Sequence, residues 1–195
     1  MSIQFVKTTP DNIRFFPAPG TPEAQMTERE VNDIAEIFQT PLAGSYNWDY
    51  ETVDGRIRKL YQLGKELNWN QESDLNWDQY YPHSQPPVDQ NFNPFVGYEP
   101  FEKLSEEEKL RFSWHNQSWT LSQFLHGEQG ALLVASQLTS CAPTFDAKLY
   151  AASQTFDEAR HVETFNRYIQ EKIGFMYPVN PHLKLLLDKI LSDPR

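Results

Sequence analysis

The sequence predicts an all-α protein, and three observations support that fold class. Apolar side chains recur at helical spacing through two long segments, about 105–140 and 144–173. Signals for the start of a helix, with Ser or Thr followed three residues later by Glu, stand at Thr27–Glu30 and Ser105–Glu108. No segment alternates apolar and polar residues as a half-buried strand does. The 195 residues are enough for one domain with a hydrophobic core.

Residues 1–104 are expected to form an N-terminal extension with two short helices and a loop-rich coat. The first helix, 27–39, follows a helix-start signal and ends before Pro41. The second, 52–67, carries its apolar residues on one side. From 69 to 104 the chain is polar, aromatic and proline-rich. We expect this stretch to be ordered, because its aromatic residues would be costly to leave exposed: Trp69, Trp77, Phe92, Phe95 and Tyr98.

Residues 105–195 are expected to form a helical hairpin followed by a terminal helix over 181–191. The first helix of the hairpin is predicted to have a break near 116–118. Pro143 suits the first position of the second helix, because its fixed φ matches a helix and its missing N–H costs nothing there. That helix should end at Gly174, since glycine readily closes a helix.

The composition excludes several functional classes. Acidic residues outnumber basic ones by 27 to 17, which gives a net charge of −10 and argues against nucleic-acid binding. No apolar run is long enough to cross a membrane, and the first residues do not resemble a secretory signal. The single cysteine, Cys141, excludes an internal disulfide framework and a cysteine-rich zinc site. A cytoplasmic protein is therefore expected.

Two helix faces carry the residues that could bind a metal ion. On the first hairpin helix one stripe is apolar except for Glu128 at its middle: Leu121, Phe124, Leu125, Ala131, Leu132, Ala135 and Leu138. On the second helix a face of mostly apolar residues contains Glu158 and His161, an E-x-x-H pair: Ala147, Tyr150, Ala151, Gln154, Phe165 and Ile169 complete that face. Side chains three residues apart on a helix are neighbours, so both can reach one ion.

The two helices should bring these groups together. Glu128 lies 13 residues before Cys141 and Glu158 lies 14 residues after Thr144, about 20 and 21 Å from the turn at the helical rise per residue. Helices joined by so short a turn pack antiparallel, so both carboxylates arrive at one level. Buried carboxylates need a compensating charge. Two hard oxygen ligands with one imidazole suit iron or manganese better than zinc.

Each candidate ligand taken alone also has an interpretation that involves no metal. An isolated E-x-x-H arises by chance on solvated helices, and a lone Glu on an apolar face often reaches water at its rim. The combination of face, depth and partner helix favours a metal site. His126 points to the opposite side from Glu128, and the other histidines are expected to have surface or structural roles: His83, His115 and His182. Tyr150 and Phe165 are expected to pack in the core and to line a pocket.

The segments Leu125–Gln129 and Asp157–His161 resemble the ferritin-like di-iron carboxylate superfamily. Within it, the resemblance is to the oxygen-activating branch, which includes monooxygenase hydroxylase subunits, the p-aminobenzoate N-oxygenase type and ribonucleotide reductase small subunits. It covers about Ser105 to Ile173, whereas residues 1–100 resemble no family domain.

The resemblance implies a set of roles. The family's site holds two irons with a Glu from each of two helices and an E-x-x-H from each of two others. By resemblance, Glu128 would be a terminal or bridging ligand, Glu158 a bridging ligand, and His161 a ligand through one ring nitrogen. Asp157 would orient the other N–H of that histidine, and Gln154 could line the oxygen pocket.

The resemblance also implies a function. Phe165 stands where the reductase branch has a radical-bearing Tyr, which favours an oxygenase or oxidase with O₂ and a small organic substrate. Two other functions remain open. One is a ferritin-like protein that oxidises or stores iron, and the other is a non-catalytic helical domain whose Glu128 and Glu158 pair with Arg or Lys.

Only half of the family's ligand set is present. Glu128 and Glu158 contribute a charge of −2, whereas two Fe²⁺ carry +4, and the chain contains no second E-x-x-H. Two remedies are expected: residues beyond 195 that complete the site, or a symmetric dimer that joins two half-sites. The first is favoured, because the long N-terminal extension resembles the larger enzymes more than the minimal dimerising ferritins.

Overall fold

The computed structural model describes residues 44–192, and this part of the chain is mainly helical with no strand. The predicted all-α class is therefore confirmed. The predicted helix over 27–39 lies outside the described residues. No helix in the described range is both long and apolar enough to span a membrane.

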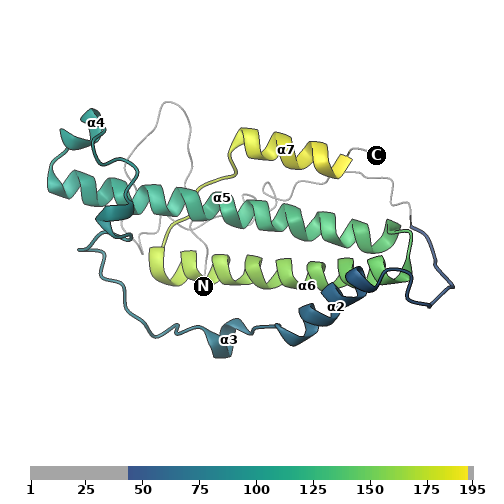
Figure 1. The fold of residues 1–195 in the computed structure, drawn as a ribbon. Helices are drawn as coiled ribbons and strands as arrows, with labels where there is room; N and C mark the ends of the chain where they lie inside the picture. The colour runs from purple at the N-terminus through teal and green to yellow at the C-terminus, as the bar shows by residue number, and fades with distance from the viewer. Residues whose placement is uncertain (1–43, 193–195) are drawn as a thin grey trace, which may run out of the picture.

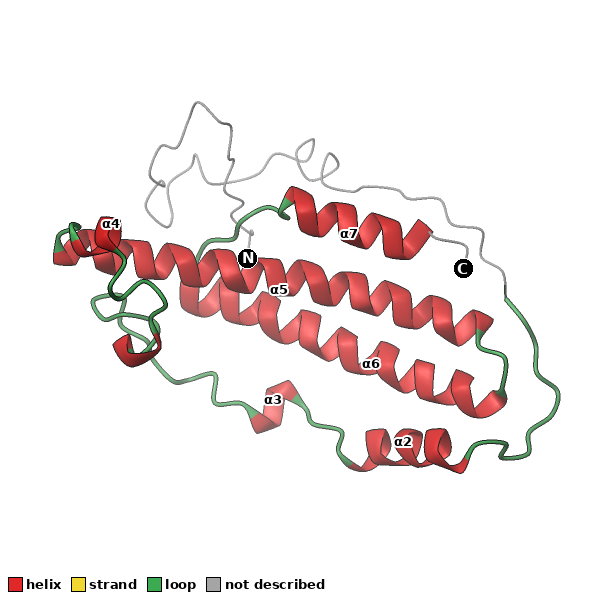
Figure 2. Ribbon diagram, turned by 45° about the horizontal axis from the view of Figure 1, so that its top comes forward, coloured by secondary structure: helices red, strands yellow, loops and turns green. Residues whose placement is uncertain are grey.

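Four helices are stacked side by side. The two longest, α5 (Glu106–Cys141) and α6 (Phe145–Tyr168), form an antiparallel hairpin. Helix α7 (Pro181–Ser192) packs on the side of α5 that faces away from α6, and α2 (Gly55–Glu66) packs on the far side of α6 (Figures 1 and 2). The hairpin therefore lies at the centre of the part of the chain that the structure describes.

Helix α5 begins as the sequence predicts but has no break. The Ser105 hydroxyl accepts from the backbone N–H of Glu108, and the Glu108 carboxylate accepts from the backbone N–H of Ser105, which forms the capping box. The predicted break near 116–118 is wrong, because α5 is continuous over 36 residues. A serine can interrupt a helix when its hydroxyl hydrogen-bonds to nearby backbone groups of the same helix. The Ser118 hydroxyl instead donates to the Phe175 carbonyl at 2.8 Å.

The turn of the hairpin differs by two residues from the prediction. Helix α6 begins at Phe145, and Thr144 is its N-cap, with Oγ1 accepting from the Ala147 N–H at 3.2 Å. Pro143 therefore precedes the cap and is not the first helical residue. The physical reason is that a threonine oxygen satisfies a free N–H of the first turn, which proline cannot do.

The other end of α6 widens into a short π-helix, η3 (Ile169–Ile173), and closes at Gly174 as predicted. Gly174 has φ = +89° and its N–H donates to the Ile169 carbonyl at 2.7 Å. The chain then runs back along α5, where Tyr177 N–H donates to Ser122 Oγ at 3.0 Å. This return segment leads into α7 at Pro181, so the predicted terminal helix over 181–191 is also confirmed.

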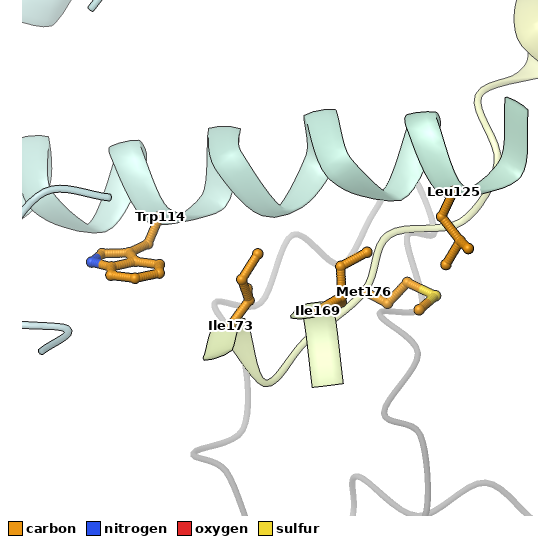
Figure 3. Close-up of a cluster of buried hydrophobic side chains, with 5 residues drawn as sticks. All are labelled: Trp114, Leu125, Ile169, Ile173 and Met176. Atoms are coloured by element: carbon orange, nitrogen blue, oxygen red, sulfur yellow. The ribbon is translucent and has the colours of Figure 1, made fainter. Parts of the chain in front are cut away.

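The main hydrophobic core lies at the end of the hairpin opposite the turn. Its buried members come from α5, from η3 and from the return segment: Trp114, Leu125, Ile169, Ile173 and Met176. Figure 3 shows the η3 and Met176 side chains facing α5. The cluster fixes α5 against the end of α6, and it leaves the middle of the hairpin for other groups.

The segment before α5 covers this hairpin as an ordered coat with short helical turns: α3 (Gln71–Asp74), η2 (Gln90–Phe92) and α4 (Glu99–Glu102). The Trp114 indole N–H donates to the Gln85 carbonyl at 2.9 Å, which fastens the coat to the core. Not every aromatic residue of the coat is covered, because Phe92 and Tyr98 are 77% and 57% exposed. The coat is thus anchored at particular side chains, and its outer surface remains aromatic.

A buried carboxylate attaches α2 to α6. Asp146, in the first turn of α6, is 1% exposed and accepts from the backbone N–H of Val53 at 2.9 Å. Arg58 of α2 lies 3.3 Å from the other oxygen of the same carboxylate. Helix α2 itself begins at Gly55 with Asp54 as N-cap, three residues after the predicted start.

Replacing the buried Asp146 with alanine should lower the free energy of unfolding by about 2–4 kcal/mol, because the Arg58 guanidinium and a backbone N–H lose their shared acceptor. Chemical denaturation followed by circular dichroism measures the change. The matched control is Asp188→Ala, which removes an exposed partner of Lys184 and should cost no more than about 1 kcal/mol. Equal losses in the two variants would contradict an anchoring role for Asp146.

Candidate metal centre

The middle of the hairpin brings the three predicted ligands together. Glu128 comes from α5, and Glu158 and His161 come from neighbouring turns of α6. One ligand atom of each side chain lies within 4.8 Å of the others. His161 Nδ1 is 3.3 Å from Glu128 Oε2 and 3.2 Å from Glu158 Oε2. The equal distances of the two glutamates from the turn therefore produce the expected meeting point.

The cluster has the donor chemistry of a site for a hard divalent cation. Its three candidate ligands are two carboxylate oxygens and one imidazole nitrogen, the set that suits iron or manganese. A single N–H on Nδ1 would have to be shared between two carboxylates. A cation placed between the three side chains could be coordinated by all of them at once.

The electrostatic environment of the two glutamates also favours a bound cation. Burial raises the pKa of Glu158, the hydrogen bond and the negative charge of Glu128 raise it further, and His161 opposes the shift. Among residues 44–192, His161 is the sole ion-pair partner of Glu128 and Glu158 within 4.0 Å. The Arg or Lys partner expected for a purely structural pair of glutamates is therefore not found in this part of the chain.

The site is more open than a core position. The side chains of Glu128, Glu158 and His161 are 26%, 19% and 35% exposed. Two apolar residues of the same stripe of α5, Phe124 and Leu138, are 54% and 50% exposed. The reason is that α5 packs mainly against α6 and α7, and no further helix of the described chain covers this stripe.

The structure corrects the role expected for Asp157. Its Oδ1 lies 3.9 Å from His161 Nε2, which is beyond hydrogen-bond distance. Arg160 pairs with the same oxygen instead, since residues three apart on a helix are neighbours. Asp157 is thus on the expected side of the imidazole, but it does not hold the ring directly.

Two residues near the site were not indicated by the sequence patterns. The ring of Trp69, from the coat, is stacked on the His161 ring with centroids 6.2 Å apart and planes inclined by 23°. The buried Arg160 donates to the Trp69 carbonyl at 2.6 Å, and its guanidinium lies over the Trp69 ring. Trp69 and His161 are 92 residues apart in the sequence, so no local spacing links them.

The residues expected around an oxygen pocket separate into different places. Gln154 lines a cleft of about 280 Å³ between α2 and α6, and none of the three candidate ligands lines it. Phe165 lines a second cavity of about 400 Å³ between the coat and the hairpin. Tyr150 is half-buried and lines neither of the two. Phe165 thus lines a cavity beside the hairpin, and the pocket role of Tyr150 stays a prediction.

The remaining histidines lie apart from the cluster. His126 Nε2 is 2.9 Å from the Tyr177 carbonyl, and His83 Nε2 is 2.8 Å from the Lys172 carbonyl. His115 Nδ1 is 3.0 Å from the Tyr177 hydroxyl. Burial, with a contribution from Arg111, lowers the pKa of His115 to about 4. The remaining one, His182, is exposed. These positions agree with the surface or structural roles predicted for His83, His115 and His182, and His126 lies away from the cluster as expected.

Comparisons of the chain with protein-family models, with curated proteins and with solved structures give no match. The functional conclusion below therefore depends on the geometry and charge of the cluster.

Proposed function

We propose that this protein is a non-haem iron oxidoreductase, an oxygenase or oxidase that uses O₂, and that its hairpin supplies one half of a di-iron centre. The observation that carries the proposal is the convergence of Glu128, Glu158 and His161 within 4.8 Å. Two partly buried carboxylates without an Arg or Lys partner in the described chain favour a bound cation, and manganese is the alternative metal for the same donor set.

The charge of the cluster supports a half-site. The two glutamates neutralise one divalent ion, so a pair of Fe²⁺ ions needs two further carboxylates. A second hairpin of the same kind would supply them, from another copy of this chain or from a further polypeptide segment. The open side of the cluster, marked by Phe124 and Leu138, is where such a hairpin has access.

Iron bound at this place would supply the capacity to bind and reduce O₂. The chain's own residues position and protect the site. Glu128 and Glu158 would hold the ion with their oxygens and His161 with Nδ1, which requires the imidazole proton to be on Nε2, the side of Asp157. The Trp69 ring, stacked on the His161 ring with centroids 6.2 Å apart, would limit rotation of the imidazole.

The test is iron loading of the purified protein without oxygen, followed by removal of free metal and measurement of bound iron and solution mass. We expect about one iron per chain, as the charge of two carboxylates allows, and uptake of O₂ by the loaded protein. Accumulation of many irons per chain would instead support iron storage. Retention of neither iron nor manganese would support a non-catalytic helical domain and contradict the proposal.

A further inference from the structure

A cavity of about 400 Å³ lies between two parts of the chain that are distant in sequence. The coat contributes one wall and the α5–α6 hairpin the other, and most of the surface is apolar or aromatic: Leu75, Trp77, Tyr81, Leu121, Phe165 and Tyr168. Its volume lies within the range of roughly 300–1,000 Å³ typical of small-molecule sites. The cavity is therefore large enough for an organic ligand.

The lining residues of the cavity begin one to two helical turns from the candidate metal ligands along both helices. Phe165 is one helical turn after His161 on α6, and Leu121 is two turns before Glu128 on α5. Residues four and seven apart on a helix share a face, so the cavity and the three ligands occupy the same side of the hairpin. A ligand in the cavity would lie one to two helical turns from the centre along the hairpin.

The walls are held in place by contacts of their own. The Trp77 indole N–H donates to the Gln71 carbonyl at 2.7 Å, and the Arg167 guanidinium lies 4.3 Å from the centre of the Trp77 ring. Lys172 donates to the Trp77 carbonyl. The rings of Tyr81 and Tyr168 meet edge to face at 6.2 Å. The aromatic surfaces are therefore present before any ligand arrives.

The polar groups of the cavity limit the charge of its ligand. Lys172 is a cation at the wall, and no Asp or Glu lines the cavity. The half-buried Gln117 lines it from α5, and its amide makes no hydrogen bond to another described residue. A cationic ligand would meet no counter-charge here, whereas a neutral or anionic group could hydrogen-bond to the Gln117 amide.

We propose that this cavity binds a flat aromatic molecule that carries one neutral or anionic polar group, with the Trp77, Phe165 and Tyr168 rings against its faces and edges and Gln117 hydrogen-bonded to the polar group. Aromatic walls favour such a ligand because stacked and edge-on ring pairs add to the gain from apolar burial. That the ligand is the substrate of the metal centre rests on the proposed function, whereas its binding does not.

The experiment measures binding of 2-naphthoate and naphthalene-2-carboxamide to the metal-free protein by titration calorimetry, with decahydro-2-naphthoate as the non-aromatic comparison. Saturable binding of both aromatic probes, stronger than that of the saturated one, is expected. Phe165→Trp should weaken it by at least tenfold, because the larger ring fills the cavity. Gln117→Leu should weaken carboxamide binding by up to about tenfold, the value of one hydrogen bond.

Gln129→Leu makes the same change at an exposed position of α5 and should leave both affinities unchanged. If Phe165→Trp does not fold, as judged by circular dichroism, the comparison of Gln117→Leu with Gln129→Leu decides. Absence of binding, or equal binding by the Gln117→Leu and parent proteins, would overturn the proposal. Iron retention without probe binding rejects this inference alone, and probe binding without iron retention rejects only the proposed metal function.

Discussion

Replacing Glu158 with glutamine is expected to abolish iron retention without destabilising the metal-free protein. In the metal-free state the Glu158 carboxylate is partly buried beside Glu128, and both burial and that neighbour raise its pKa. A neutral amide of the same shape removes this unfavourable charge. The same amide is a poor ligand for a hard cation, so metal affinity should fall by more than the roughly 10–100-fold typical for losing a residue that merely supports a ligand.

Thermal unfolding with and without Fe²⁺ or Mn²⁺ measures both effects. A metal that binds only the folded state stabilises it by about 2.7 kcal/mol at a concentration one hundred times its Kd. The parent protein should therefore show a metal-dependent rise in Tm, and Glu158→Gln should not. The control is Glu163→Gln, which makes the same change at an exposed position of α6 and should keep the rise.

The opposite pattern would identify a structural pair. If Glu158→Gln lowers the Tm of the metal-free protein, and neither protein responds to metal, the cluster of Glu128, Glu158 and His161 is an ordinary hydrogen-bonded group of the hairpin. The measurement thus separates the metal-binding interpretation from the structural one in a single series.

Replacing Ile173 with alanine should destabilise the protein by about 2–5 kcal/mol, the range observed when a large aliphatic side chain is removed from a packed core. Ile173 is 1% exposed and belongs to the cluster that joins α5 to the end of α6. The residual cavity would lie between α5 and η3. Because the N–H of the cap residue Gly174 is hydrogen-bonded to the Ile169 carbonyl of η3, this turn has little freedom to move into the cavity.

Denaturant unfolding monitored by tryptophan fluorescence measures this loss, because Trp114 lies in the same cluster. Ile190→Ala is the matched control: the side chain is on α7 and 47% exposed, so a loss below about 1 kcal/mol is expected. A loss of this small size for Ile173 as well would mean that the core is not at this end of the hairpin.

The features that the sequence predicted correctly are those set by neighbours within a few residues. The capping box at Ser105 and the end of the helix at Gly174 each depend on backbone groups one turn away. The position of Glu158 beside His161 follows from the helical period alone. The meeting with Glu128 needs one more condition, which the short turn between the helices supplies.

The features that were wrong or missing depend on residues that are distant in the chain. The continuity of α5 at Ser118 depends on a carbonyl 57 residues later. The contact of Asp157 is the exception: Arg160, only three residues away, pairs with its carboxylate in place of His161, and spacing alone does not decide between these two near neighbours. The position of Trp69 over His161 depends on the path of the coat across the hairpin. Sequence spacing carries no information on such partners.

The amino-acid order alone was enough to indicate the two long helices, their facing sides and the three groups that meet between them. The reason is that helix formation and the side of a helix on which each residue lies are periodic, local properties. A short turn also leaves two long helices little choice but to pack antiparallel. The three-dimensional packing decided how open the cluster is, which groups surround His161, and where the aromatic cavity lies. Those properties arise from contacts between segments whose separation in the chain has no fixed relation to their distance in space.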